Sequence, residues 1–283
     1  MYVKLSYDQE FNDLYIHLRS KYMKELFDLD GIGKQLDMHQ FAKEFYNGSG
    51  KVAADVSIDA NANVVGRDCV TYNFEMPKAF HKLNSYFLLW KELRKKHGLP
   101  VANQIIEMQL TGDIYINDAW DIGRPYCFNF STYDIALNGL PMGDRVKPTP
   151  PKSLFSFMRQ VEQFTVYAAN STLGATGLAD LLVVMAYYVD RLGETLTDRH
   201  YTFASLVYTL NWQFRGNQSP FTNLSLYDGE FLKELVPHYK LMDGKAPEIE
   251  TVKQLQKAFM EIMNEELRRA PITFPVTTAC FAV

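Results

Sequence analysis

Cysteine is scarce in this sequence, and its placement gives no sign of a cross-linked or zinc-binding protein. Cys69, Cys127 and Cys280 are the three cysteines among 283 residues. They are too few and too far apart for a disulfide framework, and they fit a reducing cytoplasm, where a lone thiol is either a small buried hydrophobe or a reactive group. Neither a CxxC motif nor a Cys/His spacing is present, and the six histidines include no i, i+4 pair. The sequence therefore predicts no metal site within the chain.

Long apolar runs are also missing. The most apolar stretch, residues 178–189, is interrupted by Asp180 and is shorter than the roughly 20 residues that cross a bilayer. The first 18 residues carry charges at short intervals and lack the apolar core of a signal peptide. We therefore expect a cytoplasmic protein with no membrane partner.

Neither sign of charge is in large excess. Lys and Arg number 29 against 33 Asp and Glu, a formal net charge of −4. This balance gives no electrostatic reason to expect nucleic acid as a partner, although a few local groups can still hold a nucleotide. Internal repeats and heptad arrays are absent. Hydrophobic residues make up 47% of the chain, enough for one large or two small domains.

Helical and extended patterns alternate along the chain, which favours a mixed α/β fold. Residues 2–24 suggest a strand-like start followed by a helix, residues 47–70 are rich in turn formers, and Ser153 is a candidate N-cap. Further helices are predicted over about 77–96, 102–110, 153–169, 178–191, 198–214 and 248–269. Strands are predicted over about 113–117, 221–226 and 272–283.

The most informative polar cluster covers residues 112–130. The predicted strand delivers Asn117 and Asp118 to a loop, and Cys127 follows within a Tyr-Cys-Phe-Asn-Phe run. A cysteine between aromatics is more often a buried packing residue than a reactive one. The alternative is a thiol on a strand that faces a barrel interior, with Asn117, Asp118 and Asn129 nearby.

Three other clusters carry weaker signals. In residues 214–226, a helix end and a proline turn explain Gly216 and Pro220 but not the whole polar set. Residues 170–181 are small and hydroxylated; they could hold a phosphate at a helix N-terminus, but no GK[ST] is present, and close helix packing is the commoner reason for such a stretch. Residues 59–68 indicate an Asn/Gly turn and nothing more.

Taken in order, these stretches resemble the anaerobic (class III) ribonucleoside-triphosphate reductases, which are glycyl radical enzymes. No single motif is diagnostic, but the series is specific, and it covers about residues 59–283. The matching stretches are DANANVVG, TGDIYINDAWDIGRPYCFNF, LNGLPMG, PPKSLFSFMRQVEQFTVYAANSTLGATG, GNQSPFTNLSL and APITFPVTTACF.

The resemblance implies an α/β fold forming the N-terminal half of a ten-stranded α/β barrel with a long-helix region. Residues 59–283 would be the first barrel half, truncated before the finger loop, and residues 1–58 an N-terminal extension without a recognisable ATP cone. The implied function is reduction of ribonucleotides to deoxyribonucleotides by thiyl/glycyl radical chemistry, with electrons from formate or a thiol system. The chain alone is expected to be inactive.

The resemblance also implies roles for particular residues. Cys127 corresponds to the reducing cysteine of an N-terminal barrel strand, with Asn129 beside it. Cys280 lies on a later strand and is the lesser candidate for the thiyl radical. Asn117-Asp118 stands where the family commonly has His-Asp, so no histidine role carries over there. The implied substrate-binding residues are Asn117, Asp118, Gln218, Ser219, Thr222 and Asn223. The implied effector and dimer region contains Lys152, Arg159 and Gln163.

No cofactor is expected to bind within this chain. The parent enzyme implies a glycyl radical, ATP or dNTP effectors and a C-terminal zinc site. The expected partners are ribonucleoside triphosphates, dNTP effectors, a radical-SAM activating protein, the missing C-terminal half and a second copy in a homodimer. Two alternatives stay open: a non-catalytic nucleotide-binding relative, and another glycyl radical enzyme such as one of the formate-lyase type.

Overall fold

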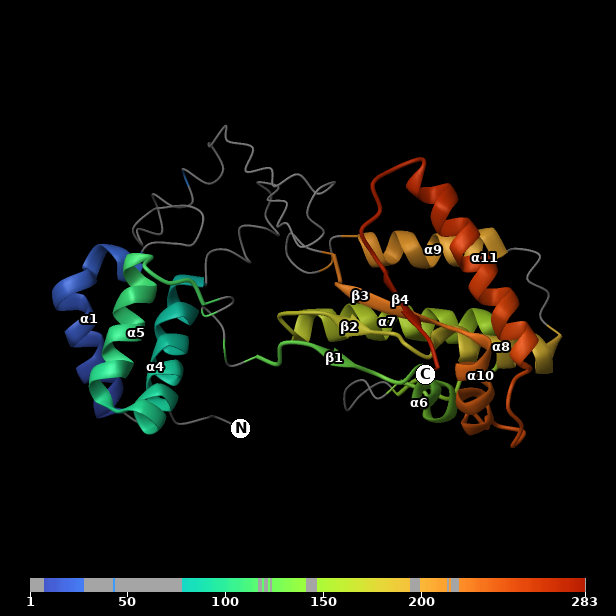
Figure 1. Cartoon of the computed structure of the whole chain (residues 1–283), viewed down its shortest axis with the longest axis horizontal. Helices are drawn as coiled ribbons and strands as arrows, with labels where there is room; N and C mark the ends of the chain where they lie inside the picture. The colour runs from blue at the N-terminus through green and yellow to red at the C-terminus, as the bar shows by residue number, and fades with distance from the viewer. Residues whose placement is uncertain are drawn as a thin grey trace. The chain divides into compact units, whose positions relative to one another are not determined.

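The computed structural model describes most of the chain, and its residues divide into two compact units (Figure 1). Among the described residues the division falls between Pro125 and Tyr126. The predicted loop 47–70 and the predicted domain boundary between residues 58 and 59 lie outside the described residues. The described ranges are 8–27, 43, 78–116, 119, 122, 124–140, 147–193, 199–212, 214 and 219–282.

The described residues of the first unit form the helices α1 (Gln9–Phe27), α4 (Lys78–His97) and α5 (Leu99–Thr111). The predicted helix over 77–96 is confirmed. Gly98 ends it with a φ of 82°, and α5 then begins three residues before its predicted start, because Pro100 is tolerated in a first helical turn. Their shared core consists of Leu14, Leu18, Tyr86, Phe87, Trp90, Ala102, Ile106, Leu110 and Ala119.

The strand predicted over 113–117 is wrong for its described part. Gly112 adopts the left-handed conformation that commonly closes a helix. The N–H groups of Asp113 and Ile114 then both donate to the Met108 carbonyl, at 2.9 and 3.3 Å. This closing turn holds the chain against the end of α5, and residues 113–116 join no sheet.

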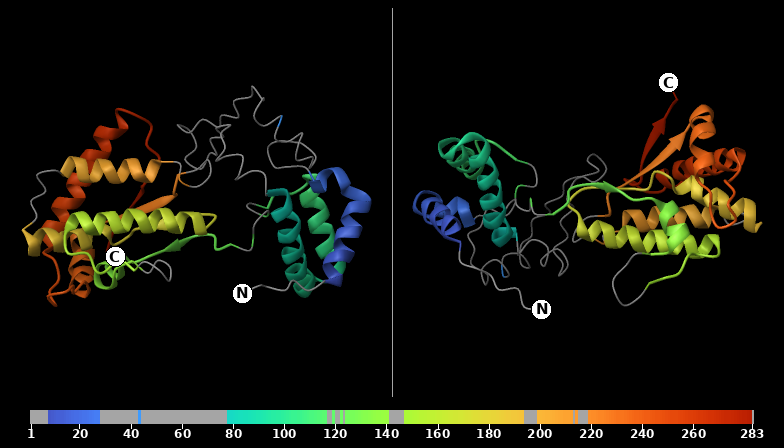
Figure 2. Two further views of the ribbon diagram at one scale, coloured as in Figure 1. Left: turned by 180° about the vertical axis from the view of Figure 1, so that it is seen from behind. Right: turned by 90° about the horizontal axis from the view of Figure 1, so that it is seen from below.

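The second unit is built on a parallel sheet whose strands follow chain order. The strands are β1 (Phe128–Asn129), β2 (Thr176–Gly177), β3 (Thr222–Tyr227) and β4 (Val276–Cys280). Connections between parallel neighbours share one hand, so a sheet in simple sequential order collects its helices on one face. Figure 2 shows the long helices of this unit on one side of the strands. The α/β fold is confirmed; closure into a barrel stays a prediction.

The helices of the crossovers agree with the sequence where they are long. Ser153 caps α7 (Leu154–Ser171) in a capping box with Ser156, as its position predicts. The helices α9 (Arg199–Asn211) and α11 (Ile249–Leu267) match their predicted ranges within three residues at each end. The two seven-residue helices α6 (Thr132–Asn138) and α10 (Gly229–Leu235) were not predicted, because such short segments carry little periodicity.

Helix α8 (Leu181–Leu192) forms the centre of the core. It begins three residues after its predicted start, because the Leu178 N–H still donates to Asn223 of β3, at 2.7 Å. Every residue from Leu181 to Tyr188 is buried, as expected for a helix that is apolar on all sides. None of the described helices is long and apolar enough to cross a membrane.

Candidate functional site

The segment that carries Cys127 is joined to the segment that leads into β2. Phe128 N–H donates to the Ala175 carbonyl at 3.0 Å, and Phe130 N–H to the Gly177 carbonyl at 3.3 Å. Cys127 directly precedes β1 and is exposed, so the interpretation of this cysteine as a buried packing residue is wrong. Its sulfur accepts a hydrogen bond from the Ala175 N–H at 3.1 Å.

Asn129 and Asn223 lie on one face of the sheet. In the ladders Asn129 pairs with Gly177, and Gly177 pairs with Asn223, so the three residues form a row across β1, β2 and β3. Side chains alternate between faces along a strand, which places Cys127 on the same side as Asn129. The Asn223 amide donates to the Thr278 hydroxyl of β4 at 2.6 Å, and this fixes its orientation.

Thr222 points to the opposite, helix-covered face. It pairs with Thr176, whose other neighbour is Phe128, and its side chain is almost fully buried. Its hydroxyl has no hydrogen-bond partner among the described residues. Ser219 is half-buried three residues before β3. The structure thus separates Thr222 from Asn223, while Asn117, Asp118 and Gln218 lie outside the described residues.

Asp180 is a positioning residue of this region that the sequence analysis treated only as a break in an apolar run. It is 5% exposed, and its carboxylate accepts four hydrogen bonds from the residues that follow β1. The donors are the Ser131 hydroxyl at 2.7 Å, the Thr132 N–H at 2.9 Å, the Thr132 hydroxyl at 2.7 Å and the Tyr133 N–H at 3.3 Å. Asp180 therefore ties the carboxyl ends of β1 and β2 together and caps α6.

Two tyrosines near this carboxylate titrate above their ordinary range. Burial is the main cause that raises the pKa of Tyr227 and of Tyr239, and the negative charge of Asp180 adds to the rise in both pKa values. The Tyr227 hydroxyl donates to the Ala179 carbonyl at 3.0 Å. Both phenols therefore stay protonated at neutral pH and serve as packing and hydrogen-bonding groups. The sequence signal for Asp180 was a single carboxylate at the start of the most apolar helix.

Helix α7 carries the residues expected in the effector and dimer region. Arg159 and Gln163 are exposed on it, and Lys152 is exposed just before it. Arg159 reaches the nearly buried Glu162 at 3.1 Å. Burial raises the pKa of Glu162, and the Arg159 guanidinium opposes that rise. Phe155 and Tyr167 are also exposed on α7, four residues before Arg159 and four residues after Gln163, and the side chain of Phe155 is 75% exposed.

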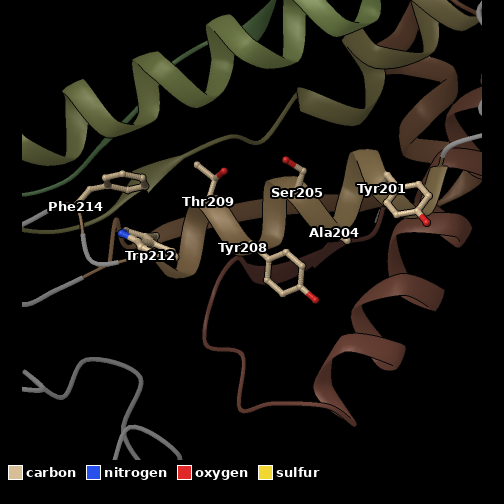
Figure 3. Close-up of a pocket in the computed structure, with 7 residues that line it drawn as sticks. All are labelled: Tyr201, Ala204, Ser205, Tyr208, Thr209, Trp212 and Phe214. Carbon is tan, nitrogen blue, oxygen red and sulfur yellow. The ribbon is translucent and has the colours of Figure 1, made fainter.

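An aromatic groove lies along α9, away from these candidates, and has a volume of about 400 Å³ (Figure 3). Beside it, the Tyr208 hydroxyl donates to the buried Glu266 of α11. Arg269 reaches the same carboxylate at 3.0 Å and His200 at 3.5 Å. Hydrogen bonding to Glu266 is the main cause that raises the pKa of Tyr208. The groove is lined by Tyr201, Ala204, Ser205, Tyr208, Thr209, Trp212 and Phe214.

Metal-binding groups do not converge in the part of the chain that the structure describes. No three or more His, Cys, Asp or Glu side chains lie close enough there to hold a metal ion. Near the open sheet face lie the Cys127 and Cys280 thiols, the Asn129 and Asn223 amides and the Thr278 hydroxyl, all of which are groups that can bind a polar organic substrate.

The comparisons with known proteins identify the class of protein to which this sheet and its thiol belong. The family model described as anaerobic ribonucleoside-triphosphate reductase matches residues 76–282. The chain belongs to this family, and the predicted resemblance is confirmed. A comparison with curated proteins finds no match.

Solved structures of the Thermotoga maritima anaerobic ribonucleotide reductase are similar over 99% of this chain at 32% identity. The complex with dATP and CTP gives a TM-score of 0.78, and the match covers 45% of that chain. The form with dATP bound in the specificity site gives 0.77 over 46% of its chain. The form with citrate in the active site gives 0.76 over 50%. The present chain therefore spans about half the length of these relatives.

Proposed function

We propose that this chain presents a reducing thiol and a ribose-binding sheet face in an anaerobic ribonucleoside-triphosphate reductase. The observation that carries the proposal is the common face of Asn129 and Asn223, with the exposed Cys127 directly before β1, within a chain of the reductase family. Amide groups both donate and accept hydrogen bonds, which suits the hydroxyls of a ribose. The reaction class is an oxidoreductase step that converts ribonucleotides to deoxyribonucleotides.

Each group on this face has a defined task in the proposed reaction. In the proposed step the 2′-hydroxyl of a ribose radical takes up a proton and leaves as water. The Cys127 thiol then gives its hydrogen atom to the carbon radical that remains, and the sulfur becomes a thiyl radical. The Ala175 N–H holds the sulfur at 3.1 Å, and Thr278 holds the Asn223 amide ready for the sugar. The remaining reducing equivalents come from formate or a thiol system. Asn117, Asp118, Gln218 and Ser219 are proposed to complete the substrate site, and Thr222 to support it from the covered face.

The glycyl radical and the zinc site are proposed to lie in other parts of the enzyme, as the family resemblance implies. A radical-SAM activating protein and the C-terminal half of the barrel are the corresponding partners. No step that we assign to this chain depends on zinc.

Effector binding and dimer formation are proposed for the exposed side of α7. Arg159 and the nearby Lys152 supply positive charge for a nucleotide phosphate, and Gln163 lies one turn further along. Phe155 and Tyr167 supply apolar area for a second copy of the chain. The Thermotoga relative binds dATP and CTP, so these are the effector and substrate to test first. The enzyme is placed in the cytoplasm, where it supplies deoxyribonucleotides for DNA synthesis.

The decisive experiment is an anaerobic assay of the complete, activated enzyme with CTP as substrate and dATP as effector. Cys127→Ser should lower dCTP formation by about 100-fold or more, because the donor thiol is lost, while CTP binding is retained. Cys280→Ser is the matched comparison, since Cys280 ends the edge strand β4. The role of Cys127 is contradicted if Cys127→Ser still forms dCTP at the normal rate. It is also contradicted if dCTP formation falls in Cys280→Ser and not in Cys127→Ser.

A further inference from the structure

Two glycines beside β1 leave no room for a Cβ atom unless a neighbouring group moves. A Cβ atom on Gly177 would lie 1.6 Å from the Asn129 Oδ1 and 2.7 Å from its Cγ. A Cβ atom on Gly174 would lie 2.3 Å from the Cys127 sulfur and 2.7 Å from the Tyr126 carbonyl oxygen. The space above each glycine is thus filled by one functional side chain of the neighbouring segment.

Backbone conformation does not explain these glycines. The glycines with positive φ are Gly98, Gly112, Gly139, Gly193 and Gly244, among the described residues. Gly174 and Gly177 have ordinary backbone angles that any residue can adopt. Glycine is also favoured where another group approaches the backbone closely. Here the Cys127 sulfur approaches Gly174 and the Asn129 amide approaches Gly177.

The same stretch also holds the Cys127 segment by hydrogen bonds. Gly174 N–H donates to the Tyr126 carbonyl at 2.5 Å, and the next residue, Ala175, donates its N–H to the Cys127 sulfur at 3.1 Å. Asn129 lies across Gly177, the residue that separates it from Asn223 in the sheet. Residues 174–177 therefore form one surface against which both side chains lie.

We infer that Gly174 and Gly177 are positioning residues of the reductase site, since they determine where the Cys127 sulfur and the Asn129 amide stand above β2. The inference rests on the proposed function for its catalytic consequence, but not for its geometry. A methyl group at position 177 pushes the Asn129 amide off β2 into the space proposed for the ribose. A methyl group at position 174 displaces the reacting sulfur.

The two substitutions are expected to separate in kinetics. Gly177→Ala should raise KM for CTP about tenfold with a smaller change in kcat, because it disturbs a group that binds the substrate. Gly174→Ala should lower kcat about tenfold or more with a smaller change in KM, because it moves the group that reacts. A loss of fold alone would lower the amount of active enzyme without this opposite pattern.

The test of the geometry is a double-mutant cycle on Gly177 and Asn129 in the complete enzyme, before activation. Gly177→Ala should lower the melting temperature by roughly 2–4 °C, because the exposed Asn129 amide has to rotate away from the new methyl group. Asn129→Ala removes the obstructing amide, so adding Gly177→Ala to it should cost less than about 1 °C. Gly229→Ala is the control, because a Cβ there would meet only the flexible end of Lys253, at 3.6 Å.

Each outcome of the cycle decides one claim. An equal loss of melting temperature from Gly177→Ala in both backgrounds overturns the inference, as does no loss in either. If Gly177→Ala no longer lowers the melting temperature in the Asn129→Ala background, the positioning role is supported. If Asn129→Ala also has normal KM and kcat, the proposed function of Asn129 is contradicted. Gly177 carries this test because a methyl group on Gly174 would also meet the Tyr126 carbonyl, which no side-chain change removes.

Discussion

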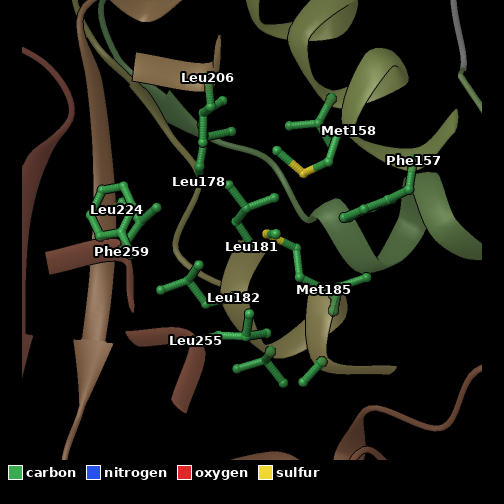
Figure 4. Packing of buried hydrophobic residues seen from close by; sticks show 14 of the residues in the cluster. Phe157, Met158, Leu178, Leu181, Leu182, Met185, Leu206, Leu224, Leu255 and Phe259 are labelled. Atoms are coloured by element: carbon green, nitrogen blue, oxygen red, sulfur yellow. The ribbon is translucent and has the colours of Figure 1, made fainter. Parts of the chain in front are cut away.

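The two faces of the parallel sheet differ most clearly on β3, although this one strand supplies both. Leu224 of β3 is fully buried on the covered face, where it packs among apolar residues of α8 and α11 (Figure 4). Its neighbour Asn223 lies on the open face and binds Thr278. On β1, likewise, Asn129 is exposed on the open face. The covered face of β3 contributes to the hydrophobic core, and the open face carries the amides proposed to bind the substrate.

This difference predicts how substitutions should behave. A change on the covered face should act on the free energy of unfolding first and on activity only through it. A change on the open face should leave the free energy of unfolding nearly unchanged and act on substrate binding or turnover. Gly177 is the informative exception, since a side chain there would meet Asn129 on the open face and should affect both stability and substrate binding.

The largest effect is expected at Leu224. Leu224→Ala should lower the free energy of unfolding by about 3–4 kcal/mol, because it leaves a cavity in a fully packed core. Urea denaturation measures this loss. Asn223→Ala is the matched control one residue away and should cost less than about 1 kcal/mol. Equal losses of the free energy of unfolding in Leu224→Ala and Asn223→Ala would show that the two faces do not differ in their contribution to stability.

A somewhat smaller effect is expected at Asp180, which follows β2 and binds the residues that follow β1. Asp180→Asn should lower the free energy of unfolding by about 2 kcal/mol, because an amide cannot accept all four hydrogen bonds that the carboxylate accepts. Asp134→Asn is the control on α6, the helix that Asp180 caps, because the Asp134 carboxylate is exposed and accepts a hydrogen bond from Asn138. Urea denaturation of both variants would sharpen the comparison; a tolerated Asp180→Asn would show that β1 is held by its ladder alone.

The smallest effect concerns a charge on the covering helix α7. Burial raises the pKa of Glu162 above its ordinary 4.5, so the native state binds this proton more tightly than the unfolded chain does. The free energy of unfolding should therefore fall as pH rises from that value through the raised one. Glu162→Gln removes the titrating group and should flatten this fall by less than about 1 kcal/mol.

Urea midpoints between pH 5 and 8 test this expectation. Glu261→Gln is the control, since that carboxylate is exposed beside Lys257 on α11. A steeper pH dependence in Glu162→Gln than in the unchanged protein would show that the Arg159 ion pair outweighs burial.

Much of the helical fold could be predicted from the sequence because its signals are local. Each signal lies within one segment of the chain. Examples are the capping serine of α7, the apolar run of α8 and the helical spacing of apolar residues in α11. Strand β3 was predicted for the same reason. Strands β1 and β2 are two residues long and exist only through their pairing, so no pattern within them could predict them.

The candidate site divides in the same way. The sequence by itself determined the family, and it singled out Cys127 and Asn129 as candidate site residues, because a series of short motifs carries that information. Only the tertiary structure decided that Cys127 is exposed, that Thr222 and Asn223 face opposite ways, and that Gly174, Gly177 and Asp180 hold the strand. These relations join residues about 48 positions apart, as between Cys127 and Ala175. The pairing of parallel strands depends on how the crossover helices pack, and a local sequence pattern carries no information on that packing.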